Sequence, residues 1–449
     1  MLWTGVVFNG AKVGFTRLSL RPAADTPQRF EIDSEAALRL RFLGVDKRVN
    51  LHALDRVRPD LTLERFRYRY ELDGSEIEVV GEADAQAVRL VLTGSGMREE
   101  RRIAVQHPVY PASAIGLVPV LRGLALERSY RYTVFQGETQ SLAEVEQAVV
   151  SWETSSLFEG SAFKLRARVD DIESTTWLAP DGRPLLELSL GGTLVSALED
   201  ADRAQRDLVT ASLNKREALV DFSLLRTPPI EDPRRVAELE IVLADVPPRL
   251  QPPSDSAQRC LRDDARLRCT VDRKATGGRL DAAQRRRYLR PSAAVNSLDG
   301  EVVLLARRLA RGADSDAARL DRIVDWMNAN IAKEAVDAFT AVEVLRSRRA
   351  ECQGHAYLLA ALARAMHLPA RVVNGIVYAP EQGGFLYHSW NEVWLRGEGW
   401  RAVDATFGQP VADATHVKLI EGERPAELLP LVGMVGRTQI ESVSVLARW

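Results

Sequence analysis

The pattern of apolar residues changes its period along the chain, and this change constrains the fold more than any other feature. Before a proline-rich segment at 246–257 the apolar residues alternate as in strands, and beyond it they recur with helical spacing. Proline-rich segments stay extended and cannot join a helix or a central strand. The segment therefore predicts a linker between domains at 1–245 and 258–449, since 449 residues are too many for one compact core.

Residues 1–245 are predicted to form a β-rich domain. Stretches such as 65–72 alternate apolar and polar residues, and Asn9-Gly10 and Asp73-Gly74 are typical of tight hairpin turns. We expect a large antiparallel sheet or open barrel with few helices, one of them a short helix at 141–149.

The segment 258–449 is predicted to place helices before an antiparallel sheet, which makes the fold class α+β. A Thr340-to-Glu343 capping pattern begins one of the helices. The helices are expected at 302–309, 320–327, 340–345 and from Cys352 to Met366, and the strands at 370–378, 385–395 and 400–406.

Cys352 directly precedes an apolar helical pattern and is the first candidate for chemistry. A thiol at a helix N-terminus lies near the positive end of the helix dipole, which favours the nucleophilic thiolate. The backbone N–H groups that follow it could receive an oxyanion. Cys352 is therefore predicted to be a nucleophile.

Two further residues could complete a triad with this cysteine. His388 lies in an aromatic-rich strand pattern and could take the thiol proton, and Asp404 on the next strand could fix the imidazole tautomer. The two positions have the same parity. They can lie opposite each other only if the connection between the strands has an odd length or a bulge, for which 397–399 is the candidate.

These residues stand in three motifs that resemble the transglutaminase-like (papain-like) superfamily, in particular its bacterial cysteine protease branch. The motifs are Ala350-Glu351-Cys352-Gln353-Gly354-His355, Tyr387-His388-Ser389-Trp390-Asn391-Glu392-Val393 and Trp400-Arg401-Ala402-Val403-Asp404-Ala405-Thr406. The resemblance covers about 285–449, and 414–416 also follow the pattern of that branch. Where the branch has Gly, Asp and Pro, this chain has Ala350, Glu351 and Ala405, none of which removes a triad group.

The resemblance implies thiol-dependent acyl transfer on a peptide or protein substrate through Cys352, His388 and Asp404. Hydrolysis by a cysteine protease or amidase is preferred because no feature indicates an amine site. The alternatives are a transglutaminase or amide ligase, and an inactive binding or scaffold module whose β domain contacts a cell-envelope partner. The triad needs no cofactor and no metal. His355 and His416 are interpreted as structural, and Gln353 and Asn391 as either cleft or capping residues.

Composition excludes several other classes of protein. A formal net charge of −2 gives no bulk attraction to nucleic acid, and no phosphate-binding glycine motif precedes a helix. No apolar stretch reaches the roughly 18 residues of a membrane span, and Met1–Phe8 does not read as a signal peptide.

The spacing of Cys260 and Cys269 suggests a small disulfide, with two unrelated thiols as the alternative. A disulfide favours an oxidising compartment. We therefore expect the bacterial periplasm, reached by a leader segment outside this sequence, and otherwise the cytoplasm.

Overall fold

The computed structural model describes residues 1–42, 45–94, 97–170, 172–213, 218–274 and 277–449. The chain divides into two compact units, 1–94 with 98–219, and 220–449 with 95–97. Within the described residues, no helix is long and apolar enough to cross a membrane.

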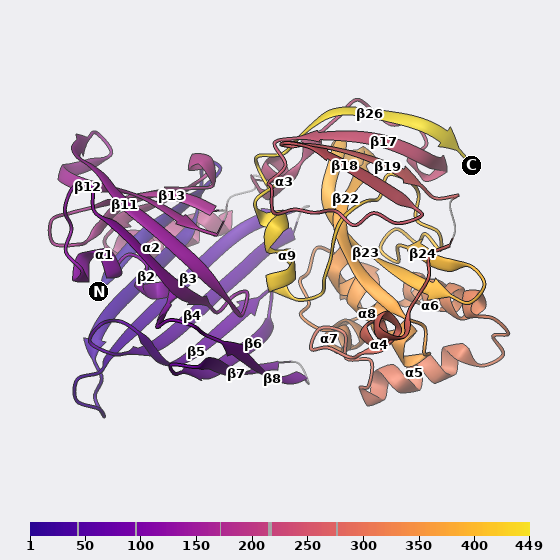
Figure 1. Cartoon of the computed structure of the whole chain (residues 1–449), viewed down its shortest axis with the longest axis horizontal. Helices are drawn as coiled ribbons and strands as arrows, with labels where there is room; N and C mark the ends of the chain where they lie inside the picture. Colours follow the sequence, from indigo (N-terminus) through magenta and orange to yellow (C-terminus); the bar gives the residue numbers. More distant parts are fainter. Residues whose placement is uncertain (43–44, 95–96, 171, 214–217, 275–276) are drawn as a thin grey trace. The chain divides into compact units, whose positions relative to one another are not determined.

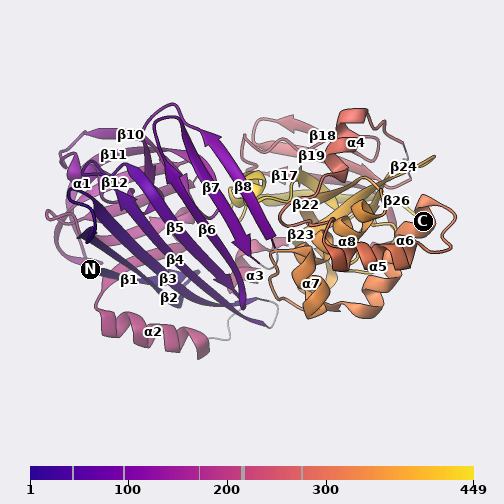
Figure 2. The same ribbon diagram turned by 90° about the horizontal axis from the view of Figure 1, so that it is seen from below.

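The N-terminal unit is built on one large sheet whose strands are antiparallel, apart from a parallel pairing of β9 with β10 (Figures 1 and 2). Neighbours follow sequence order on either side of a central pairing between β1 and β15. Helix α2 (Ala201–Leu213) packs on β1 to β3, and α1 (Val118–Leu121) is short. The strands are β1 (Leu2–Phe8), β2 (Ala11–Pro22), β3 (Phe30–Phe42), β4 (Val45–Val57), β5 (Leu63–Leu72), β6 (Ser75–Ala83), β7 (Ala87–Gly94), β8 (Met97–Ala104), β9 (Val109–Pro111), β10 (Ser129–Gln136), β11 (Ser141–Ser155), β12 (Phe158–Val169), β13 (Ile172–Leu178), β14 (Pro184–Ser189) and β15 (Leu194–Glu199).

Two predicted hairpins are present and one predicted helix is wrong. Asn9-Gly10 and Asp73-Gly74 have positive φ at both positions, which matches the twist of the strands they join. The helix expected at 141–149 is instead part of β11. Ala143, Val145 and Val149 are buried at alternate positions, a period of two that only a strand satisfies.

The C-terminal unit begins earlier than the proline-rich segment indicates. Strand β17 (Val236–Ala244) pairs with β19 (Arg266–Asp272) and β26 (Gln439–Arg448), and β16 (Leu225–Arg226) pairs with β23 (Gly384–Leu395). The predicted boundary at 245 and linker at 246–257 are thus corrected. The segment joins two strands of one sheet, and buried Val246 and Leu250 hold it against that sheet's core.

The site lies in this second unit, where helices pack on a sheet ordered β16-β23-β22-β25, and β24 also pairs with β23. A second sheet has the order β18-β19-β17-β26, and β20 and β21 form a short parallel pair. The remaining elements are α3 (Ala218–Ser223), β18 (Gln258–Asp263), α4 (Ala282–Leu289), α5 (Gly300–Ala310), α6 (Asp316–Asn330), β20 (Ala332–Lys333), α7 (Ala341–Ser347), β21 (Arg349–Ala350), α8 (Cys352–Ala365), β22 (Ala370–Ala379), β24 (Gly399–Val403), β25 (Val417–Glu421) and α9 (Pro425–Val432).

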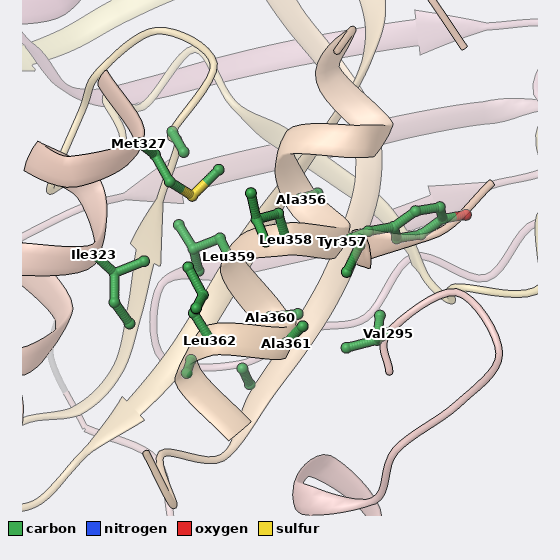
Figure 3. Packing of buried hydrophobic residues seen from close by; sticks show 14 of the residues in the cluster. Val295, Ile323, Met327, Ala356, Tyr357, Leu358, Leu359, Ala360, Ala361 and Leu362 are labelled. Atoms are coloured by element: carbon green, nitrogen blue, oxygen red, sulfur yellow. The ribbon is translucent and has the colours of Figure 1, made fainter. Parts of the chain in front are cut away.

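Helix α8 lies at the centre of this unit's core. Its residues from Gly354 to Arg364 are all buried, and Leu358, Leu359 and Leu362 pack against Ile323 and Met327 of α6 (Figure 3). A helix that is apolar on all sides is stable only when it is enclosed. Because burial fixes the helix, it also fixes the position of its first residue, Cys352.

The predicted disulfide between Cys260 and Cys269 is confirmed. The two residues lie directly opposite each other on the paired strands β18 and β19. Cys352 is the free cysteine of the chain.

Candidate active site

Glu351 caps the helix that carries Cys352. Its carboxylate accepts hydrogen bonds from the backbone N–H groups of Gln353 and Gly354, each at 2.8 Å. These are the N–H groups that the sequence suggested for an oxyanion, so that expectation is wrong for Gln353 and Gly354. The Glu351 side chain, which stands where the branch has Asp, folds back onto its own helix and occupies both N–H donors.

The same carboxylate also contacts the nucleophile. The Cys352 Sγ lies 3.2 Å from Glu351 Oε2. Burial raises the pKa of the Cys352 thiol well above its usual value, and the Glu351 charge raises it further, against a smaller opposite effect from the Ser389 backbone N–H. Burial, and after it the neighbouring carboxylate, thus oppose the preference for the thiolate that the helix dipole was expected to give.

The Ser389 backbone N–H lies close enough to the Cys352 sulfur to lower the thiol pKa, so the sulfur lies beside the strand that carries His388. Helix α8 packs on β22 and β23 (Figure 1). His388 lies within β23, opposite Gly375 of β22. The His388 ring is stacked on Phe407 with 4.9 Å between ring centroids. The structure thus brings the predicted nucleophile and base to neighbouring elements.

His388 and Asp404 are joined by a hydrogen bond of 2.8 Å between Nε2 and Oδ2. In the register of β23 with β24, Asn391 pairs with Val403, so the position opposite His388 would be 406. Asp404 lies two residues short of it, on the same face, just beyond the end of β24. The connection at 396–398 has the odd length that equal parity requires.

Asp404 is fully buried and its carboxylate is held from both sides. Its Oδ1 accepts from the backbone N–H groups of Thr406, at 2.8 Å, and Phe407, at 3.3 Å. Burial alone would raise the pKa of Asp404, but hydrogen bonds and charge from His388 and His416 outweigh it and lower the pKa far below its usual value. An ionised carboxylate can only accept, so His388 carries its proton on Nε2 and leaves Nδ1 as the ring nitrogen that can take another.

The structure places a second histidine on Asp404. His416 Nε2 lies 3.1 Å from the same Oδ2, and the His416 ring is fully buried. The sequence indicated only a structural role for it. The similarity of 414–416 to the protease branch was the one available signal, and no strand pattern placed this loop beside Asp404.

The other singled-out polar residues face the surrounding structure. His355 Nδ1 pairs with the Glu351 carbonyl oxygen at 2.9 Å, and Asn391 donates to the Ala356 carbonyl at 3.0 Å. Gln353 donates to the Tyr357 hydroxyl. These contacts tie α8 to its cap and to β23, which agrees with a structural role for His355.

One cation lies at the edge of the site. The Lys333 Nζ sits 4.0 Å from the centroid of Phe407, the ring that stacks on His388. Burial lowers the pKa of Lys333, while the charges of Asp404, Glu381 and Cys352 act in the opposite direction. Lys333 is thus close enough to favour a negative charge on the Cys352 sulfur.

His388, Asp404 and His416 are also the described residues whose ligand atoms could meet at a metal ion, since these atoms lie within 4.8 Å of one another. Each atom is already engaged in a hydrogen bond between an imidazole N–H and the carboxylate. A metal ion would have to displace a proton from each ring. Hydrogen bonding accounts for the arrangement without one.

The fold and these contacts define the class of the C-terminal unit. It is an α+β domain in which a cysteine at a buried helix N-terminus lies beside a histidine–aspartate pair on an adjacent sheet. Residues 304–405 match the profile of the Transglutaminase-like superfamily. The chain therefore contains a transglutaminase-like domain at 304–405.

Individual relatives resemble parts of the chain. Kyphoscoliosis peptidase of mouse is 31% identical over 127 residues, which cover 25% of this chain and 19% of that protein. The chain thus matches about a fifth of the length of that relative. A proposed cysteine protease from Cytophaga hutchinsonii (19% identity, TM-score 0.31) covers 47% of this chain and 83% of its own. The periplasmic domain of TgpA from Pseudomonas aeruginosa (17% identity, TM-score 0.30) covers 42% and 73%. The two solved structures do not enter the functional argument.

Proposed function

We propose that the protein catalyses thiol-dependent acyl transfer on a peptide or amide, with Cys352 as nucleophile, His388 as general base and acid, and Asp404 as the residue that orients His388. The observation that carries the proposal is the 2.8 Å bond between His388 Nε2 and buried Asp404, beside the free cysteine of the chain. The match of 304–405 to the Transglutaminase-like superfamily supports this class of reaction.

The reaction begins when the Cys352 sulfur attacks the amide carbonyl carbon and its proton moves to His388 Nδ1. The imidazolium is stabilised by Asp404 and returns the proton to the leaving amine as the C–N bond breaks. A thioester remains on Cys352. Water then resolves it in a protease or amidase, and an amine in a transglutaminase or ligase. We favour water because no feature of the sequence indicates an amine site.

The test compares wild type with His388→Ala and Asp404→Asn in labelling by a thiol-reactive amide probe between pH 6 and 10. His388→Ala should slow labelling by about 10² or more, since the proton acceptor is lost. Asp404→Asn should cost less than the roughly 10⁴ seen in serine triads, because a thiol is more acidic than a hydroxyl. His107→Ala, an exposed histidine of the N-terminal unit, is the control. Equal rates in all four folded proteins would refute the triad.

A second candidate is an inactive binding module, and the contact between Cys352 and Glu351 favours it. A thiol that donates to a carboxylate at 3.2 Å is held in its unreactive form. In that case the N-terminal sheet would supply the function by binding a cell-envelope partner. Failure of wild-type protein to label at any pH between 6 and 10 would favour this candidate.

We also propose that the protein works in an oxidising compartment outside the cytoplasm. The Cys260–Cys269 disulfide supports the proposal, because such bonds are rare in reducing cytosol. Trapping thiols in intact cells tests it. Recovery of both cysteines in reduced form would contradict it.

A further inference from the structure

His416 makes hydrogen bonds through both of its ring nitrogens. Nε2 lies 3.1 Å from Asp404 Oδ2. Nδ1 lies 3.1 Å from the Asp413 backbone carbonyl oxygen and 3.4 Å from Asp413 Oδ1. The ring is fully buried, so these contacts are its polar environment among the described residues.

Every atom facing those nitrogens is an acceptor. A carbonyl oxygen cannot donate, and an ionised carboxylate cannot donate either. Asp404 is kept ionised by the hydrogen bonds described above, and Asp413 accepts from the backbone N–H of Thr415 at 2.9 Å and from Gln409 Nε2 at 2.9 Å. Neutral imidazole has one donor and one acceptor nitrogen. One of its two contacts would therefore set the lone pair of a ring nitrogen against the lone pair of an oxygen. Only the doubly protonated ring satisfies both sides.

The charges around His416 allow a buried cation. Asp404 and Asp413 supply two negative charges in direct contact. Arg273 donates to the His416 carbonyl oxygen at 2.7 Å, and the His388 ring centroid is 5.9 Å away. Burial lowers the pKa of His416, but the hydrogen bonds and charges of Asp404 and Asp413 outweigh it and raise the pKa to about 9.

We infer that His416 is a positioning residue that stays protonated through neutral pH and shares the Asp404 oxygen with His388. The His416 ring donates to Asp404 Oδ2 and so fixes the position of the carboxylate. Its positive charge also reduces the degree to which Asp404 stabilises a protonated His388. The inference rests on the proposed triad, because its effect on chemistry passes through His388.

Loss of this charge has a defined electrostatic consequence. When one positive charge about 6 Å from the His388 ring is removed, both Cys352 and His388 bind their protons more tightly. The plot of Cys352 alkylation rate against pH has an acidic limb and a basic limb, and both should therefore move to higher pH by about one pH unit. A purely structural role would reduce the alkylation rate without moving the limbs.

The first experiment measures iodoacetamide alkylation of Cys352 from pH 5 to 10 in wild type, His416→Gln and His355→Gln. Gln at 416 can still donate to Asp404 but carries no charge. His355 is the matched control, because it is also buried near the site while burial lowers its pKa instead of raising it. We expect both limbs to shift upward in His416→Gln alone. Unmoved limbs in a folded His416→Gln protein would overturn the inference.

The second experiment reads the protonation state of the histidines directly in the unmodified chain. Its main result therefore depends neither on enzymatic activity nor on a variant that folds. Histidine-selective ¹⁵N labelling of the unmodified chain, read by two-bond ¹H–¹⁵N correlation at pH 7.5, distinguishes imidazolium from either neutral tautomer. The His416 ring should give the imidazolium pattern, assigned by its absence from His416→Gln or, if that protein does not fold, by its resistance to titration below pH 8. Spectra in which every ring is neutral at pH 7.5 would overturn the inference. If His416 is charged but His388→Ala labels normally, the proposed triad fails and not the protonation state.

Discussion

Replacement of Glu351 by Gln should make Cys352 more reactive, although it removes an acidic group from the helix cap. Glu351 accepts from two backbone N–H groups of α8 and from the Cys352 thiol. Its negative charge raises the pKa of the Cys352 thiol. Gln is nearly the same size and has no charge, so the variant isolates the electrostatic effect.

The magnitude follows from the 3.2 Å contact between Sγ and Oε2. Two unit charges about 4 Å apart interact by about 4 kcal/mol at an effective dielectric constant of about 20. Hydrogen bonds from two backbone N–H groups already offset part of the Glu351 charge, so we take roughly half of that energy. About 2 kcal/mol corresponds to about 30-fold more thiolate. Because less basic thiolates are weaker nucleophiles, with a Brønsted coefficient of about 0.5, alkylation should be about fivefold faster.

The assay is the rate of iodoacetamide alkylation of Cys352 at pH 7, together with the thermal unfolding temperature. Gln retains one acceptor for the two N–H groups, so the helix cap should lose about 1 kcal/mol. Asp299→Asn is the matched control, because Asp299 caps α5 through the N–H groups of Glu301 and Val302. It should show a smaller stability loss, because Asn keeps the single oxygen that accepts both N–H groups, and an unchanged alkylation rate. A Glu351→Gln protein that is folded and alkylates no faster than wild type would refute the reasoning.

Three further outcomes are expected. Lys333→Met should slow alkylation of Cys352 at pH 7 by roughly threefold, since a nearby cation favours the thiolate, and an unchanged rate would exclude that role. Charges of Lys418, Arg371 and Arg273 outweigh burial and lower the pKa of Glu392 to about 2, so about 3 kcal/mol of stability should be present above pH 4.5 and lost as the pH falls towards 2. Hydrogen-exchange mass spectrometry of β23 would measure this loss, which should be absent in Glu392→Gln. Reduction of Cys260–Cys269, whose residues are 9 apart, should cost about 2–3 kcal/mol, and a melting temperature unaffected by dithiothreitol would contradict this.

The sequence was sufficient to predict the parts of the site that depend on local pattern. The helical period from 302 to 366, the strand that carries His388 and the equal parity of 388 and 404 all follow from nearest neighbours in the chain. Equal parity required a connection of odd length or a bulge near 397–399, and the connection at 396–398 has an odd length.

The features that the sequence did not reveal depend on contacts between distant segments. β17 pairs with the C-terminal strand β26, so no local pattern could show that it belongs to the second unit. The prolines at 246–257 marked a true break in secondary structure but not a domain boundary. The role of His416 depends on a loop that returns to Asp404, and the effect of Glu351 on the thiol depends on a rotamer that folds back onto the helix.

Glu351 and His416 act on the same proton-transfer pair with opposite charge, which leads to a last prediction. Glu351 contacts the Cys352 sulfur and disfavours the thiolate, whereas His416 contacts Asp404 and weakens its hold on a second imidazolium. Glu351→Gln should move the acidic limb of the alkylation profile to lower pH, and His416→Gln should move it to higher pH. The double variant removes one charge of each sign, so its limb should return towards that of wild type within about half a pH unit, as expected for contributions that add. A double variant that behaves like either single variant would mean that one residue acts only through the fold, and the comparison of the two singles would identify which.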